Sequence, residues 1–325
     1  MSQSIQSVLA QSFADFELRI IDDDSTDASP AIAQSIDDSR VHYFRNAERY
    51  GLFKTLNTGI EAAKSPLVKL WAQDDRMLPG SLGSFVDFAN AHPSAGMIYC
   101  DFLKIDSQGN RTGDEVRYFG QRQRTPKLAG EKISALLFWF YGCLPGNIST
   151  VMLRRAAWKK VGGFTTGIQQ APDYEMWVRI SEDFDIGFIQ RQLIELRDHP
   201  FQLSKLGFEQ LTIIEEELEI VDALRSKLRP LISESALNRS WVTRRGYQHV
   251  HWLVKSAVRG DLKRTLQGWR GIKKYGQPWQ QLIFWLVSLN GRFFVPDRDQ
   301  EFDSLVPLFE NGDTSASLRI RKELV

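Results

Sequence analysis

The chain has 325 residues, 42% of them apolar and 25% charged, with 41 Lys and Arg against 40 Asp and Glu. This is the composition of an ordinary globular protein, and the even charge balance gives no global reason to expect a nucleic-acid-binding protein. Two cysteines cannot form a disulfide framework, and neither a signal-peptide pattern nor an apolar run of ~20 residues is present, so we expect a cytoplasmic protein.

Helices and strands alternate through the first part of the chain. The spacing of apolar residues predicts helices at 4–12, 31–36, 51–63 and 81–91, and strands at 16–21, 41–44, 66–72 and 96–101. Such alternation predicts a mostly parallel sheet covered by helices. Polar residues at 105–128 predict a hairpin and a mobile loop. Beyond them, a strand is predicted at 148–153 and a helix at 172–184.

Two of the predicted strands end in carboxylates. Asp22, Asp23 and Asp24 follow the first strand, and Asp74 and Asp75 follow the strand at 66–72. Ligands bind at the carboxyl ends of strands in open α/β sheets, so we expect both groups to converge on one cleft. Paired carboxylates across a cleft commonly hold a hard divalent cation that bridges phosphates. The alternative is that these charges are only solvated and cap a helix.

A further carboxylate, Asp173, stands at the predicted start of the helix at 172–184, after the glycine-rich run 162–167. A carboxylate that binds no metal can accept the proton of an attacking hydroxyl. The alternative for Asp173 is an ordinary helix-start acid stabilised by the dipole. His199 is a further candidate site residue, and the alternative is that it only has a structural role.

The ordered succession of these motifs, from about residue 4 to 204, resembles the family-2 glycosyltransferases, which are inverting enzymes of the GT-A fold. The resemblance is carried by Ser7–Phe13 with Phe16–Leu18, Ile21–Asp27, Asn57–Gly59, Gln73–Asp75, Gly162–Phe164 before Asp173–Trp177, and Arg197, His199 and Ser204. Three positions depart from the family pattern. Asp24 stands where glycine is usual, and Ala72 and Pro172 stand where acids are usual.

The resemblance implies roles for the acids. Asp23, beside Asp22, would bind the nucleobase of the donor, most often uracil. Asp75 would bind Mg²⁺ or Mn²⁺ beside Asp74, and Asp75→Ala is expected to leave the fold intact because the carboxylate should be exposed. Asp173 would be the catalytic base.

Two residues of the closing motif are also implied to act at the site. Arg197 and His199 would bind the donor, and His199 would also approach the metal. We therefore predict a GT-A-like glycosyltransferase domain at 1–204 and a helical C-terminal extension at 205–325. The predicted reaction is metal-dependent, inverting transfer of a hexose from a nucleoside-diphosphate sugar, UDP first, to a hydroxyl of a glycan or lipid-linked acceptor in surface polysaccharide synthesis.

The start of the chain bears on this prediction. In the family, the helix at 4–12 follows an interior strand and loop, and the sequence begins at that helix. Omitting an interior strand would leave buried backbone groups unpaired, at ~1–3 kcal/mol each. We therefore expect that the natural chain has roughly twenty more residues. The alternative is a truncated, inactive module that binds sugar nucleotides.

Another enzyme class uses a similar acidic pattern. Asp22, Asp24 and Thr26 after an apolar strand also fit the phosphatases of the haloacid dehalogenase superfamily. In that class Asp22 would be a nucleophile and Asp24 the acid/base. This alternative leaves the segment from 162 to 199 without a role.

The C-terminal extension carries an uneven charge. Between Trp241 and Tyr275 there are nine Lys and Arg but one acid, Asp261, and several tryptophans are interleaved with them. Basic residues with tryptophan suit attraction to anionic lipids, so we expect a peripheral membrane contact, at the inner face of the cell membrane. The alternative is that the tryptophans pack these helices against the rest of the protein.

Overall fold

The computed structural model describes residues 1–112, 128–198, 212–241 and 247–274, together with positions 279, 282, 283, 286 and 302. The chain divides into two compact units, of which unit 1 is Met1–Ser134 with Cys143–Gln202 and unit 2 is Ala135–Gly142 with Leu203–Val325. The boundary predicted from the sequence lies at 204, and residues 135–142 have no separate place in that prediction.

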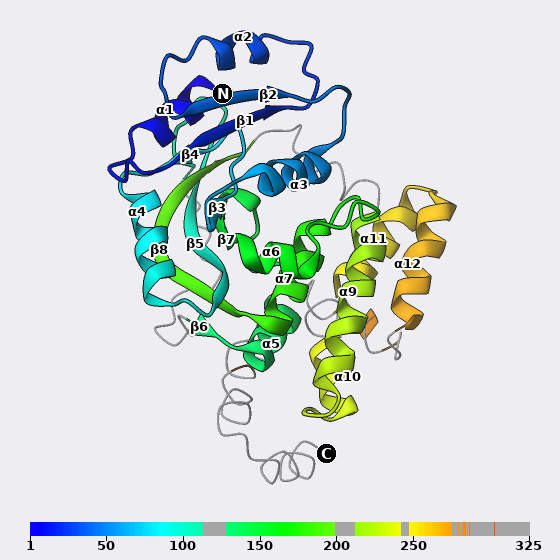
Figure 1. The fold of residues 1–325 in the computed structure, drawn as a ribbon. Coiled ribbons are helices and arrows are strands. Elements are labelled where there is room, and N and C mark those ends of the chain that lie inside the picture. Colours follow the sequence, from blue (N-terminus) through cyan, green and yellow to red (C-terminus); the bar gives the residue numbers. More distant parts are fainter. Residues whose placement is uncertain are drawn as a thin grey trace. The chain divides into compact units, whose positions relative to one another are not determined.

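Unit 1 begins with a two-stranded parallel ribbon and three helices (Figure 1). Strands β1 (Leu18–Asp22) and β2 (Val41–Arg45) pair in register from Leu18↔Val41 to Asp22↔Arg45. The helices are α1 (Ser2–Leu9), α2 (Ser29–Gln34) and α3 (Leu52–Ala62). Gly59 of α3 lies so close to β1 that a Cβ atom there would stand 2.4 Å from Ile21 Cδ1, so a larger residue would require the end of the Ile21 side chain to move. We call β1 and β2 the β1–β2 ribbon.

The main sheet of unit 1 is mixed. Its order is β3-β7-β5-β8-β4, with β6 also paired to β8. The strands are β3 (Leu67–Lys69), β4 (Arg76–Met77), β5 (Ala95–Ile105), β6 (Leu128–Ala129), β7 (Val151–Arg154) and β8 (Asp185–Arg197). Only β5 and β8 pair in parallel within it, and the other pairings are antiparallel. The predicted mostly parallel sheet is corrected in this respect, because a buried apolar strand such as β7 carries no sign of its direction.

Helices cover both faces of this sheet. Helix α4 (Ser81–Ala91) packs on β5 and β8 from one side, and α6 (Arg155–Val161) and α7 (Pro172–Asp183) lie on the other (Figure 1). The central strand β5 is buried on both faces. Phe85 of α4 and Trp177 of α7 are fully buried as well. The predicted sheet flanked by helices is thus confirmed, and its core lies between these layers.

Unit 2 is helical, as the sequence predicts. It contains the end of α5 (Glu131–Tyr141), and α9 (Thr212–Leu228), α10 (Glu234–Trp241), α11 (Tyr247–Val258) and α12 (Leu262–Lys274). Trp139 Nε1 donates a hydrogen bond to Ser240 Oγ at 2.9 Å, and its ring lies 6.1 Å from that of Trp241, which is buried. Across the described residues, no helix is both long enough and apolar enough to cross a bilayer.

Two predicted features fall partly outside the described residues. The turn at 107–110 is present, since the Asp106 carboxylate accepts hydrogen bonds from the backbone N–H groups of Gln108 and Asn110. The rest of the predicted loop, at 113–127, lies outside the described residues. So do most of the positions after residue 274 in the predicted helical extension.

Candidate active site

Both carboxylate oxygens of Asp22, the last residue of β1, are bonded by other residues of the chain. Its Oδ1 accepts a hydrogen bond from Ser25 N at 2.8 Å, its Oδ2 accepts one from the Tyr43 hydroxyl at 2.7 Å, and Arg45 Nη1 lies 3.7 Å from Oδ2. Burial alone would raise the pKa of Asp22, but the bonds from Ser25 and Tyr43 and the charge of Arg45 together lower it. Asp22 is therefore an ionised carboxylate that links β1 to β2.

Asp23 holds the segment that leads into α3. Its Oδ1 accepts hydrogen bonds from Asn46 Nδ2 at 2.8 Å, Tyr50 N at 2.7 Å and Thr55 Oγ1 at 3.0 Å, and its Oδ2 accepts one from Gly51 N at 2.7 Å. These donors outweigh the effect of burial and lower the pKa of Asp23. Asp23 thus fixes the shape of segment 46–51 at the open end of the β1–β2 ribbon.

Asp24 occupies a backbone conformation that usually belongs to glycine. Its φ is +58°, in the left-handed region that aspartate tolerates better than most residues. Arg45 Nη2 donates to Asp24 Oδ1 at 2.7 Å and to Ser25 O at 3.1 Å. The arginine therefore stabilises the turn in which aspartate replaces the usual glycine.

The second acidic pair joins β3 to β4. Asp75 is only 2% exposed, so the expectation of an exposed cleft carboxylate is wrong for this residue. Its Oδ1 accepts a hydrogen bond from Arg197 N at 2.9 Å, while its Oδ2 is buried without a hydrogen-bond partner. Burial raises the pKa of Asp75 to about 6, against the lowering effects of Ser149 and Arg197 N–H. Asp74 is half-buried beside it, and its carbonyl oxygen accepts a bond from Arg197 Nε at 2.9 Å.

Lys69 is a buried cation near this pair that sequence reasoning missed. Its Nζ donates to the carbonyl oxygens of Leu70 at 3.0 Å and Val151 at 3.2 Å, and also to that of Ser149. Burial lowers the pKa of Lys69 to about 7, although Cys100 and Asp75 act in the opposite direction. In the sequence, Lys69 interrupts an otherwise apolar strand, and that interruption was the only available signal.

We expect Lys69→Met to remove a pH dependence of stability. The pKa of Lys69 is lower in the folded state than its ordinary ~10.4, so between pH ~7 and ~10.4 the unfolded state binds more protons and the free energy of unfolding rises with pH. The slope approaches ~1.4 kcal/mol per pH unit at most. Urea unfolding of both proteins at pH ~7 and ~8, below the ordinary pKa of the Cys100 thiol, measures it.

The exposed Lys159→Met serves as the matched control and should keep the wild-type slope. Equal slopes in the wild type and in Lys69→Met would show that Lys69 is charged in the folded protein at neutral pH.

Asp173 lies in the first turn of α7, as predicted, and is half-buried. Its Oδ1 accepts a hydrogen bond from Tyr174 N at 2.8 Å, and Cys143 Sγ lies 3.7 Å from its Oδ2, within reach of a thiol hydrogen bond. Cys143 belongs to a loop that runs to the 3₁₀ turn Ile148–Thr150, where Ser149 Oγ accepts a bond from Ala72 N at 3.0 Å. One loop therefore contacts both Asp173 and the segment that carries Asp74 and Asp75.

Asn57 fixes the glycine-rich run before α7. Its side-chain amide donates to Phe164 O at 2.8 Å and accepts from Phe164 N at 2.8 Å, so it binds that peptide as a strand neighbour would. Gly163 has φ +77°, and a Cβ there would stand 2.6 Å from Asn57 Oδ1. Arg179 of α7 donates to Gly163 O at 2.7 Å and pairs with Glu175. These contacts give a structural reason for two motifs of the family resemblance, Asn57–Gly59 and Gly162–Phe164.

The closing motif is described only in part. Arg197, at the end of β8, donates from Nη1 to the carbonyl oxygens of Asp106 at 2.9 Å and Ser107 at 3.0 Å. It therefore braces the turn after β5 against Asp74 and Asp75. His199 and Ser204 lie outside the described residues.

Comparison with known proteins matches a family to the first part of the chain and finds relatives over a larger part of it. Residues 1–145 match the family model described as Glycosyl transferase family 2. An uncharacterized protein of Mycobacterium tuberculosis is 26% identical over 275 residues, which are 82% of this chain and 83% of that protein. An uncharacterized glycosyltransferase of Rickettsia typhi is 26% identical over 215 residues, 65% of this chain and 64% of that protein.

Two solved structures share the fold. One is residues 1–349 of S. aureus TarS in complex with UDP-GlcNAc, with a TM-score of 0.51 and 14% identity over 81% of this chain and 84% of that chain. The other is the mannosyltransferase PcManGT from Pyrobaculum calidifontis in complex with GDP-Man and Mn²⁺, with a TM-score of 0.50 and 15% identity over 88% of this chain and 81% of that chain. At these identities the likeness shows the fold alone, which is GT-A-like.

Proposed function

We propose, on the premise that residues 1–145 belong to glycosyl transferase family 2, that this chain transfers a sugar from a nucleoside-diphosphate sugar to an acceptor hydroxyl with inversion. The family and the GT-A-like fold support glycosyl transfer itself. The observation that carries the rest is that one loop contacts both Asp173 and Ala72, which lies just before Asp74 and Asp75. This loop runs from Cys143 to Thr150.

The donor would bind at the acidic ends of β1 and β3. The two structural neighbours hold UDP-GlcNAc and GDP-Man, which supports a sugar nucleotide here, and we favour UDP. Four hydrogen bonds from this chain already engage Asp23, so it would act mainly by shaping segment 46–51 around the nucleobase, with Asp22 beneath it. Arg197 and His199 would serve the diphosphate side.

The residues at the second acidic pair fit a divalent cation in part. The buried Asp75 Oδ2 is an acceptor without a donor, which Mg²⁺ or Mn²⁺ could satisfy. Asp74 stands next to it, and His199 would complete the ligand set from outside the described residues. In the part of the chain that the structure describes, no three His, Cys, Asp or Glu side chains form a metal cluster. When bound, such an ion would neutralise the diphosphate charge.

Asp173 would act on the acceptor. The acceptor hydroxyl attacks the anomeric carbon opposite the diphosphate, so the new C–O bond forms as the bond to the diphosphate breaks. A carboxylate oxygen of Asp173 takes the hydroxyl proton. The bond from Tyr174 N orients this carboxylate, and the Cys143 thiol lies against its other oxygen. We propose a glycan or lipid-linked acceptor, as in surface polysaccharide synthesis.

The alternatives differ in what they require of the acids. As a phosphatase nucleophile, Asp22 would need a free oxygen, yet Ser25 N and the Tyr43 hydroxyl bind both of its oxygens. The phosphatase interpretation is therefore disfavoured. A module that binds donor without turnover keeps all the contacts above and differs only in product formation.

A thermal-shift screen of nucleoside diphosphates and diphospho-sugars, with and without Mn²⁺, tests the donor. A ligand at a hundredfold excess over its Kd stabilises the folded state by ~2.7 kcal/mol, so the matching nucleotide should raise Tm by a few degrees. Release of nucleoside diphosphate in the presence of an acceptor then separates the enzyme from the binding module. No shift with any nucleotide would refute the proposed donor class.

A further inference from the structure

Helix α12 presents an apolar stripe that no described element covers. Leu262, Leu266 and Trp269, spaced by four and three residues, are 71%, 51% and 39% exposed. A different side of α12 packs against α11. There, Ile272 is buried, and a Cβ on Gly268 would stand 3.3 Å from Leu253 of α11. The packing of unit 2 therefore accounts for one side of α12 and leaves this stripe in solvent. Val258, at the end of α11, is also exposed, at 83%.

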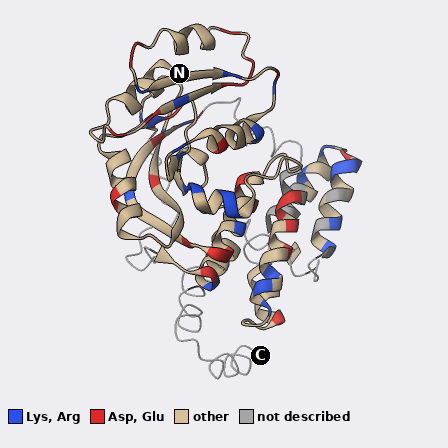
Figure 2. Cartoon of the chain, in the orientation of Figure 1, with Lys and Arg blue, Asp and Glu red and all other residues tan. Residues whose placement is uncertain are grey.

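Cations surround this stripe. Arg259, Lys263, Arg270 and Lys273 are exposed, and the Lys273 ammonium lies 5.4 Å from the ring centroid of Trp269. The only acid between residues 255 and 274 is Asp261, which is paired with Arg264 at 3.2 Å. Figure 2 shows the basic positions along α12. We call the stripe with its four exposed cations the α12 face.

The described helical positions after α12 repeat the pattern. Trp279, Ile283 and Leu286, again spaced by four and three residues, are 73%, 59% and 50% exposed. Two successive segments thus show large apolar side chains to solvent at helical spacing. Single exposed apolar residues are ordinary, whereas contiguous ones mark a binding surface.

We propose that the α12 face binds the surface of a membrane that contains anionic lipids. A basic helix with an apolar stripe lies in the plane of the interface, with the apolar side chains among the acyl chains and the cations at the headgroups. Nucleic acid would use the cations but would leave Leu262 and Leu266 without a role. A second copy would bring two strongly basic faces together, and their repulsion opposes such a dimer. This inference does not depend on the proposed glycosyl transfer.

Co-sedimentation of the full chain with phosphatidylcholine vesicles, with and without phosphatidylglycerol, tests the proposal. We expect binding to the anionic vesicles at low salt and a large loss at high salt, since exposed charges are screened. Each cation near the surface is worth about a fivefold change in partition, so Lys263→Gln with Arg270→Gln should weaken binding by roughly 25-fold. Leu266→Ser with Trp269→Ser should weaken it by at least ~10-fold.

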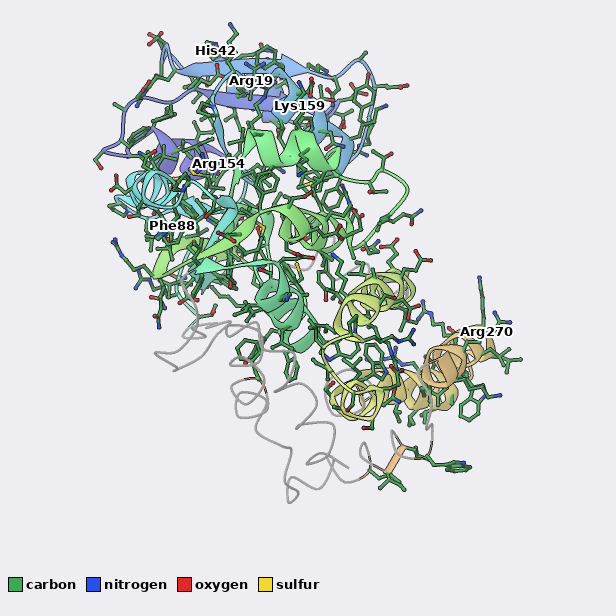
Figure 3. The ribbon with its side chains drawn as sticks, turned by 60° about the horizontal axis from the view of Figure 1, so that its bottom comes forward. Arg19, His42, Phe88, Arg154, Lys159 and Arg270 are labelled. Carbon is green, nitrogen blue, oxygen red and sulfur yellow. The ribbon has the colours of Figure 1, made fainter. Side chains whose placement is uncertain are left out.

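Lys159→Gln is the matched control, because Lys159 is an exposed cation on α6 of unit 1 (Figure 3). It should bind as the wild type does, and unchanged thermal melting shows that each variant is folded. Equal binding to neutral and anionic vesicles, or wild-type binding by the α12 variants, would overturn the proposal. If lipid binding was absent and the serine variants abolished a dimer in solution, the α12 face would instead bind a second copy. If duplex DNA bound in place of lipid and the serine substitutions did not change that binding, the face would instead bind nucleic acid.

Discussion

Asp173→Asn is expected to lower kcat by ~10²–10⁴-fold while the donor still binds. The range is that of general-base catalysis, which is lost because the amide cannot accept the acceptor's proton. Asparagine keeps an oxygen for the bond from Tyr174 N, so the start of α7 should remain formed. The measurement is steady-state transfer with the donor and acceptor found by the screen, together with the donor-dependent Tm shift, which should be unchanged.

Glu175→Gln is the matched control on the same helix. Glu175 faces the glycine-rich run, where its carboxylate pairs with Arg179 and accepts a bond from Thr165 Oγ1 at 3.0 Å. Its substitution should change kcat by less than tenfold. If instead Asp173→Asn lost less than tenfold and Glu175→Gln lost more, the base would be Glu175.

Asp74→Asn and Asp75→Asn should each lower transfer by ~10²-fold or more, since the ion at a departing diphosphate supplies several kcal/mol of transition-state stabilisation. They should also abolish the part of the Tm shift that depends on Mn²⁺. Asparagine is preferable to alanine at Asp75, because Asp75→Ala would remove the acceptor of the partly buried Arg197 N–H, at up to ~1–3 kcal/mol. Loss of stability in the alanine variant would then be mistaken for loss of metal binding.

Asp101→Asn, at a half-buried carboxylate of β5, is a suitable control for removal of a negative charge in unit 1. It should keep the Mn²⁺-dependent shift. A shift that survives in both Asp74→Asn and Asp75→Asn would place any metal elsewhere, and transfer unaffected by a chelator would remove the metal from the mechanism.

The sequence predicted the elements of unit 1 well because their apolar spacing is local information. The helix predicted at 172–184 is α7 (Pro172–Asp183), and the strand predicted at 96–101 lies within β5 (Ala95–Ile105). The direction of β7 could not be predicted, because an apolar strand pairs equally well in either direction. Nor could the contact of Trp139 with Ser240, 101 positions apart, since nothing local records a long-range partner.

At the candidate site the sequence indicated which acids matter and not their surroundings. Asp22, Asp23 and Asp75 are held by hydrogen bonds from Tyr43, Tyr50 and Arg197, all of them distant in the sequence. Whether a carboxylate after a strand is exposed or buried depends on such partners, so the burial of Asp75 was missed. Lys69 was missed for the same reason, because its three carbonyl acceptors come together only in the fold.

The separation of the β1–β2 ribbon from the main sheet has a consequence for donor affinity. Two strands alone carry little stability, so their amide hydrogens should exchange sooner than those at the centre of β5 and β8. Asp22 keeps its partners Tyr43 and Arg45 only while the ribbon is closed. A nucleotide that binds only the closed ribbon can bind only the closed fraction of the molecules. Its apparent Kd therefore rises as the open fraction grows. The strength of donor binding is then set partly by how often the two strands separate.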